Sequence, residues 1–164
     1  MDTTNTKNCT VTTAISMAND LIRQHLDDDR DIIGWTVRID TAKRRFGYCR
    51  YRDKTISLSS ILITINSEQR VRETILHEIA HAIAGYAAGH GPEWKRVSTS
   101  IGGPPNRCSS AEITNIPEGK YTLVCDTCGF STFRHRQTNR KKSCSKCFPH
   151  YFNEKYLLRL VANR

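Results

Sequence analysis

Two Cys-x-x-Cys pairs near the C-terminal end restrict the fold of this chain more than any other feature. Cys125 and Cys128 form the first pair, Cys144 and Cys147 form the second, and 15 residues separate the pairs. Two Cys-x-x-Cys turns, or knuckles, at this distance fit a tetrahedral metal site of four sulfurs. Such a site has no open position for water and is therefore structural. The spacing predicts a zinc ribbon. Because the surrounding residues include few large apolar side chains, metal binding would supply much of its folding free energy.

Other interpretations of these cysteines are weaker. Two disulfides are disfavoured because the chain has seven cysteines, an odd number, and a redox Cys-x-x-Cys prefers a βαβ setting. His135 and His150 stay open as substitute ligands. The remaining cysteines are interpreted as ordinary thiols, although the last lies close to the ribbon: Cys9, Cys49 and Cys108.

The cysteine-bearing region also carries nearly all of the excess positive charge. The formal charge is +9, and residues 119–164 hold ten Lys and Arg against two acidic residues, whereas residues 1–118 hold 15 against 14. This division favours a basic module that binds a polyanion, with a solvated basic tail as the plain alternative. Phe130 and Phe133 precede a cationic loop, which suits single-stranded DNA bound without strong sequence preference. The predicted DNA contacts are Arg134, Arg136, Arg140, Lys141 and Lys142.

The first hundred residues predict an α+β domain. Apolar residues recur at helical spacing over 14–26, which indicates an amphipathic helix. Alternating polarity over 35–39 indicates a half-buried strand, and segments around 46–51 and 55–58 indicate two more. Together these segments predict an N-terminal helix and a small antiparallel sheet.

The longest helical pattern follows Asn66 and Ser67, which are suitable N-cap residues. Gly85 within it costs about 1 kcal/mol relative to Ala, which predicts a packing reason for this glycine. Gly89 is the expected stop, and Pro92 is expected to begin a second, short helix. This pattern predicts the helix that carries the most informative motif of the chain.

Composition suggests where the domains begin and end. We expect a disordered tail over 1–13, a domain over 14–103, a linker over 104–119 and the basic ribbon over 120–164, closed by a short helix around 156–161. The start is polar and no run of about 18 apolar residues occurs, so neither a secretory signal nor a membrane span is predicted. We therefore expect an intracellular protein.

The long helical pattern contains a His-Glu-x-x-His motif. His77 and His81 lie four residues apart, so both imidazoles leave the same helix face and can bind one Zn²⁺. Glu78 lies about 100° around the helix, where it can act as general base toward a water without binding the metal itself. Two surface histidines beside a salt-bridged glutamate are the alternative. The apolar neighbours argue against it, because an unliganded buried pair is costly.

A catalytic zinc site usually has three protein ligands and one position for water, so a third ligand is needed. The metzincin spacing would require a glycine and a histidine where this chain has Ala84 and Ala87, which excludes that class. His90 follows nine residues after the motif, between two glycines that allow close approach, and is the preferred ligand. Glu93 and Glu112 are its rivals.

In this order, the motifs resemble the SprT-like family, the metalloprotease group that includes the Spartan proteases. The likeness runs from about Leu21 to Cys147. It rests on the Trp35 strand, Arg45-Phe46-Gly47-Tyr48, Ile56-Ser57-Leu58-Ser59, His77-Glu78-Ile79-Ala80-His81, His90-Gly91-Pro92-Glu93-Trp94-Lys95 and the four-cysteine ribbon. The close succession of the two histidine motifs is its most specific part.

The resemblance implies that His77, His81 and His90 bind a catalytic zinc and that Glu78 is the catalytic acid/base. It also implies a DNA-associated endopeptidase that degrades proteins bound or crosslinked to DNA, with a second, structural zinc in the ribbon. A non-enzymatic DNA-binding zinc protein with structural metal sites only is the alternative. A zinc deaminase is disfavoured because its Pro-Cys-x-x-Cys signature is lacking.

Overall fold

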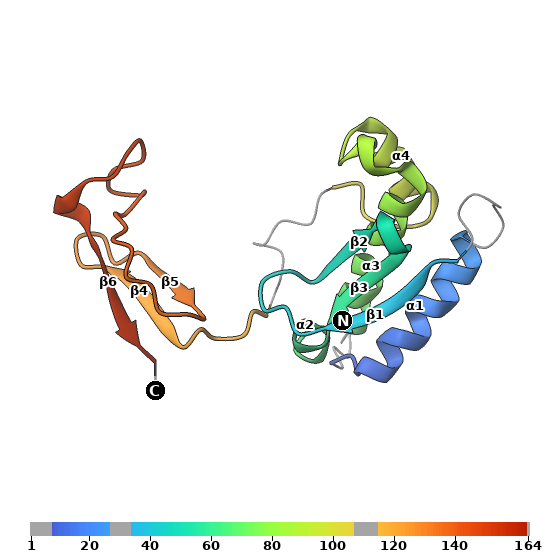
Figure 1. The fold of residues 1–164 in the computed structure, drawn as a ribbon, viewed down its shortest axis with the longest axis horizontal. Helices are drawn as coiled ribbons and strands as arrows, with labels where there is room; N and C mark the ends of the chain where they lie inside the picture. The colour runs from blue at the N-terminus through green and yellow to red at the C-terminus, as the bar shows by residue number, and fades with distance from the viewer. Residues whose placement is uncertain (1–7, 27–33, 107–114, 164) are drawn as a thin grey trace, which may run out of the picture. The chain divides into compact units, whose positions relative to one another are not determined.

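The computed structural model describes residues 8–26, 34–106 and 115–163 (Figure 1). The chain divides into two compact units, Met1–Pro117 and Glu118–Arg164. Helices and two small sheets are both present, which confirms the α+β class. Within the described part of the chain, no helix has the length and apolar character needed to cross a membrane.

The first helix starts earlier than its apolar pattern predicts. Helix α1 spans Val11–Leu26, and the Thr10 hydroxyl accepts from the backbone N–H of Thr13 at 3.0 Å at its start. Cys9 is buried, and its N–H donates to the carbonyl of Asn66 at 3.0 Å. The disordered tail predicted to reach residue 13 is therefore wrong from residue 8 onward, and its first seven residues lie outside the described ones.

The first sheet contains β1 (Thr36–Asp40), β2 (Gly47–Arg50) and β3 (Thr55–Ser59) in the order β1-β3-β2. β2 and β3 are antiparallel, but β1 and β3 are parallel, so the prediction of an antiparallel sheet is wrong for this pair. The 3-10 turn η1 (Tyr51–Asp53) follows β2 and reverses the chain, so that β3 lies between β1 and β2. β3 takes the central place because all five of its residues are buried.

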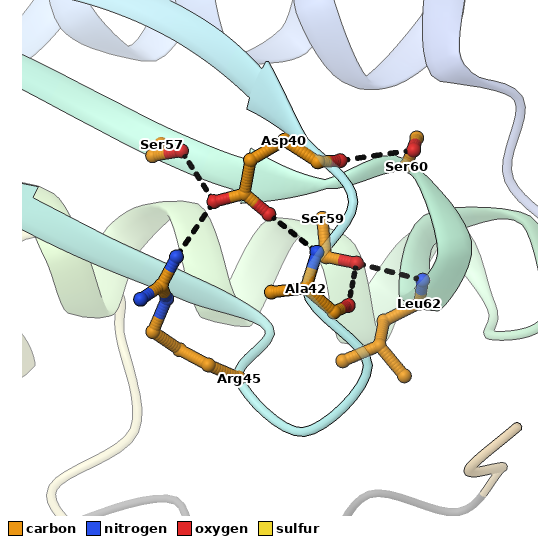
Figure 2. Close-up of polar contacts among 7 residues, drawn as sticks. All are labelled: Asp40, Ala42, Arg45, Ser57, Ser59, Ser60 and Leu62. Carbon is orange, nitrogen blue, oxygen red and sulfur yellow. Dashed lines mark hydrogen bonds and ion pairs between the residues drawn. The ribbon is translucent and has the colours of Figure 1, made fainter. Parts of the chain in front are cut away.

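A polar network fixes the crossing from β1 to β2 (Figure 2). The Asp40 carboxylate accepts from the backbone N–H of Ala42 at 2.8 Å, from the Ser57 hydroxyl at 2.8 Å and from Arg45 at 2.7 Å. The Ser59 hydroxyl donates to the carbonyl of Ala42. These bonds join both parallel strands to the crossing loop and hold the start of β2 in place.

Helix α3 (Glu68–Ala84) follows the short α2 (Ser60–Thr64) and packs against α1 and the sheet. Ser67 caps it as predicted, accepting from the N–H of Arg70 at 3.3 Å. The helix ends at Ala84, so Gly85 is its C-cap and not an interior residue. Gly85 has φ +81°, and a Cβ there would meet nothing within 4 Å, so the expected packing reason is wrong.

Two short elements complete the first unit. The 3-10 turn η2 (Tyr86–Ala88) follows α3, and α4 (Pro92–Ser100) begins at the predicted proline. Trp94 and Val97 of α4 pack on Ala80 of α3 and form a small second core.

The second unit is a three-stranded antiparallel sheet of β4 (Tyr121–Cys125), β5 (Ser131–Arg134) and β6 (Leu158–Ala162), in the order β5-β4-β6. A 3-10 turn, η4 (Glu154–Tyr156), precedes β6. The closing helix predicted around 156–161 is wrong, since these residues form the turn and most of β6. The apolar residues of this segment fit the period of a helix or of a strand. The strand forms because pairing along the open edge of β4 satisfies the backbone hydrogen bonds of both β4 and β6.

Candidate metal centres

Three imidazoles converge in the first unit. The Nε2 atom of His90 lies 3.0 Å from that of His81 and 3.1 Å from that of His77, and one nitrogen from each ring lies within 4.8 Å of the other two. A tetrahedral zinc with Zn–N bonds of about 2.0–2.1 Å would place its nitrogen ligands about 3.3 Å apart. The donor set and its spacing therefore fit a divalent metal ion such as zinc.

The backbone after α3 explains how the third histidine reaches the pair. His77 and His81 lie one turn apart on α3, and Gly85 ends the helix. Gly89, with φ +51°, reverses the chain after η2, so it is a point of reversal and not the helix stop that its position predicts. The returning segment places His90 opposite the other two rings.

The rival ligands are not placed at this centre. The carboxylate of Glu93 binds Arg96 at 2.6 Å and 3.1 Å and is exposed, while Glu112 lies outside the described residues. Over residues 8–26, 34–106 and 115–163, the group of potential ligands here consists of the three histidines. Three protein donors are the number typical of catalytic zinc sites.

Glu78 is buried between α3 and β2. It is 7% exposed, and the backbone N–H of Cys49 donates to its carboxylate. Burial raises the pKa of Glu78 to about 8, although the Cys49 N–H and the charge of Arg45 act in the opposite direction. A Cβ on Gly47 would lie 3.2 Å from Cγ of Glu78 and 3.1 Å from Cγ2 of Thr74, so a larger residue there would have to displace these side chains by a few tenths of an ångström.

The surroundings of His81 favour its neutral form. Burial, and then the neighbouring His90, lower the pKa of His81 to about 4. The Tyr51 hydroxyl donates to the carbonyl of His81 at 2.8 Å and so fixes the last turn of α3. A neutral imidazole has the free lone pair that a metal ligand needs.

Two residues of this centre were not predicted from sequence. Trp94 was named only as part of the His90–Lys95 motif, with no role at the site, but its indole lies against all three imidazoles. Tyr51 was assigned to a strand. The available signal was the nearness of Trp94 to His90 in the sequence, since Trp94 lies in the first turn of the helix that begins two residues after the third ligand.

The four cysteines form a second group in the second unit. The Sγ atoms of Cys125 and Cys147 are 3.8 Å apart, and those of Cys128 and Cys144 are 3.6 Å apart. Zn–S bonds of about 2.3 Å place tetrahedral sulfurs about 3.8 Å apart, whereas a disulfide requires about 2.05 Å. The four thiols are free, and their spacing fits a metal ion.

The knuckle backbone favours ionised sulfur at the first position. The backbone N–H groups of Cys128 and Thr127 donate to Cys125 and lower the pKa of this thiol to about 6. Hydrogen bonding with the Cys128 sulfur raises the pKa of Cys147. The two shifts are opposite because Cys125 accepts backbone hydrogen bonds, which stabilise its thiolate, whereas the hydrogen bonds of Cys147 favour its protonated form. His135 and His150 do not join this group, so its donor set is four sulfurs.

A model of the SprT-like family matches residues 11–115. The chain belongs to the SprT-like family. The Germ cell nuclear acidic-1 protein of Caenorhabditis elegans is 30% identical to it over 143 residues, which cover 76% of this chain and 25% of that protein. Protein SprT of Glaesserella parasuis serovar 5 is 30% identical over 122 residues, covering 68% and 78% of the two chains. Protein SprT of Vibrio atlanticus is 34% identical over 100 residues, covering 56% and 60%.

The SprT-like match contains the three-histidine centre and ends before the ribbon sheet. Membership of the family and the histidine triad together indicate a metallopeptidase-type protein. The chain spans about a quarter of the length of the C. elegans relative, so the activity and partners of that whole protein are not transferred to it.

The predicted DNA-contacting side chains lie at one end of β5 and in the loop that follows it. Arg134 ends the strand, and Arg136, Arg140 and Lys141 are exposed. The Lys141 ammonium pairs with Glu154 at 3.8 Å, and Lys142 is half-buried. Aromatic rings accompany these cations: Phe133 is 47% exposed, and the ammonium of Lys146 lies 5.1 Å from the ring centre of Phe130.

Proposed function

We propose that this chain is a zinc-dependent endopeptidase that acts inside the cell on proteins bound or crosslinked to DNA. The convergence of three Nε2 atoms in a member of the SprT-like family is the observation that carries the proposal, and the buried Glu78 follows His77 on the same helix. His77, His81 and His90 would hold the ion. When bound, Zn²⁺ would polarise the scissile carbonyl and make water a stronger nucleophile.

Glu78 would carry the proton transfers. Glu78 directly follows His77 on α3, about 100° around the helix, and it does not belong to the group of potential metal ligands. It would accept a proton from the attacking water and then donate that proton to the leaving amide nitrogen. The Cys49 N–H would orient the carboxylate, and Gly47 of the same strand lies close to the Glu78 side chain.

The second unit would bind DNA. Its excess of Lys and Arg suits a phosphate backbone, and its exposed Phe133 offers a ring on which an unpaired base can stack. Binding of this kind would concentrate the enzyme where its protein substrate is attached. The second metal, held by Cys125, Cys128, Cys144 and Cys147, would be structural.

The proposal is tested with Glu78→Gln, using a protein crosslinked to single-stranded DNA as substrate. Glutamine keeps the shape and a hydrogen-bond acceptor but is not a base, so we expect cleavage to fall by about 10²–10⁴-fold. Zinc content and DNA affinity should stay at wild-type values. Glu93→Gln is the matched control, because Glu93 is nearby and exposed, and it should cleave normally.

The opposite result identifies the alternative. If zinc-loaded wild-type protein is inert toward free and DNA-crosslinked substrates, the chain is a DNA-binding zinc protein without protease activity. If Glu78→Gln cleaves at the wild-type rate, the assigned base is wrong. Replacing Arg134, Arg136 and Arg140 with alanine tests the DNA part separately, since only cleavage of the DNA-attached substrate should weaken.

A further inference from the structure

Trp94 is buried against all three imidazoles of the metal centre. It is 0% exposed, and its ring centre lies 4.6 Å from that of His77, 5.4 Å from that of His81 and 4.8 Å from that of His90. The proposed mechanism gives Trp94 no role, because an indole neither binds zinc nor transfers protons at neutral pH. Its contact with every ligand therefore needs a different explanation.

The imidazoles need neighbours that hold their orientation. The Nε2 atom of His90 lies about 3 Å from those of His81 and His77. In the tautomer that binds a metal, each Nε2 carries a free lone pair, so these lone pairs repel one another until an ion is bound, and rotation of a ring would relieve that repulsion. His90 comes from a loop segment, whereas His77 and His81 are fixed to α3. A rigid surface that touches all three rings can keep them pointed at one position.

Trp94 has the packing that such a surface requires. It lies in the first turn of α4 and packs on Ala80 and Val97, with Ile83 and Ala84 at the edge of the cluster. Small side chains on α3 let α4 approach closely. None of the described residues accepts a hydrogen bond from the indole N–H, so the contacts with the imidazoles are ring contacts and not hydrogen bonds.

We propose that Trp94 is a positioning residue that orients the three imidazoles before the metal binds. This inference rests on the proposed function only in taking His77, His81 and His90 as the metal ligands. Preorganised ligands bind an ion more tightly because less side-chain freedom is lost on binding. Substitution of outer-shell partners of metal ligands typically weakens metal affinity by about 10–100-fold.

The test compares Trp94→Leu, Trp94→Phe and Val97→Ala in the full chain. Val97 belongs to the same cluster and is buried, so Val97→Ala loosens the α3–α4 packing but keeps the ring contacts between Trp94 and the imidazoles. Zinc affinity is measured by competition with a chromophoric chelator. Cobalt substitution separates the two sites, because only the cysteine site gives thiolate-to-cobalt charge-transfer absorption.

We expect Trp94→Leu to weaken zinc binding at the histidine centre by about 10–100-fold. Trp94→Phe should largely retain the affinity, and Val97→Ala should leave it unchanged even though it lowers stability. Cobalt at this centre should also quench Trp94 fluorescence, and Trp94→Phe should remove that metal-dependent quenching from a chain that has two tryptophans.

Equal zinc affinity in Trp94→Leu and the wild type would overturn the inference, as would an equal loss in Val97→Ala. A wild-type protein that binds zinc at the histidines but does not cleave would refute the endopeptidase and leave the positioning role supported by the affinity series. A wild-type histidine centre that binds no zinc would refute both.

Discussion

The two candidate metal centres lie in units that differ in how they are held together. The first unit has an extensive core shared by α1, the sheet, α2 and α3, with side chains such as Leu26, Leu58 and Ile75 fully buried. In the described part of the second unit, the buried apolar side chains are Leu123 and two of the cysteines themselves. The first unit can fold on hydrophobic burial, whereas the second has little to bury apart from its ligands.

The two units therefore differ in whether packing forms the metal site or the metal site stabilises the fold. In the first unit, packing of α3 and α4 brings the histidines together, so the fold makes the site. In the second unit, a metal ion held by the four cysteines would join the two Cys-x-x-Cys turns, so metal binding would drive folding. The same metal would therefore have a chemical role in one unit and a structural role in the other.

The largest expected effect comes from removing the cysteine site. Cys125→Ser combined with Cys128→Ser should unfold the β4–β6 sheet, because structural zinc contributes about 10–16 kcal/mol in small zinc domains. The helices of the first unit should stay folded. Amide hydrogen exchange would report both units in one experiment, and metal analysis should show the loss of one zinc.

His77→Ala is the reciprocal variant. It should lose the other zinc and leave the exchange protection of β4 and β6 unchanged. Protected β4–β6 amides in the cysteine variant would contradict the comparison, because the second unit would then fold without its metal.

A core substitution in the first unit should have a smaller effect of a different kind. Leu58 is 0% exposed in the central strand, so Leu58→Ala should cost about 2–5 kcal/mol in the free energy of unfolding of the first unit. Metal binding by the cysteines should be unaffected. Leu157→Ala is the matched control, since Leu157 is 37% exposed and should change stability by less than about 0.5 kcal/mol. Denaturant unfolding measures the change in the free energy of unfolding for both variants. Equal changes would contradict the conclusion that hydrophobic burial stabilises the first unit more than the second.

Sequence predicted the features that depend on short-range spacing. The histidines four residues apart, the paired cysteines and the Ser67 cap need only local geometry, and each occupies the position that geometry predicts. The third histidine was reachable because glycines allow a tight reversal next to it.

Long-range pairing was not predictable in the same way. The insertion of β3 between β1 and β2 depends on which strand is most completely buried, and that is decided by packing across the whole unit. Residues 156–161 have an apolar pattern that fits a helix or a strand, and only the open edge of β4 decides between them. The contact of Trp94 with the imidazoles depends on how α4 packs on α3.

The smallest expected effect concerns the network at Asp40. Burial alone would raise the pKa of Asp40, but bonds from the Ala42 N–H, the Ser57 hydroxyl and Arg45 outweigh it, so the pKa is lowered. A lowered pKa means that Asp40 stabilises the fold fully above its unfolded pKa of about 3.9, and this stabilisation is lost as the pH falls through the lower folded value. Asp40→Asn should therefore cost about 1 kcal/mol at neutral pH and progressively less in acid.

Denaturant unfolding of the first unit from pH 7 to pH 2 would measure how far the difference in stability between the wild type and Asp40→Asn decreases in acid. Asp53→Asn is the control, because Asp53 also pairs with an arginine, Arg50, but lies at the surface, where ion pairs contribute little. A constant difference between the wild type and Asp40→Asn at every pH would show that the network acts through its shape and not through the Asp40 charge. The crossing from β1 to β2 would then be stabilised by packing, like the rest of the first unit. The second unit would still depend on thiolates that bind a cation, so the difference between the two units would be larger.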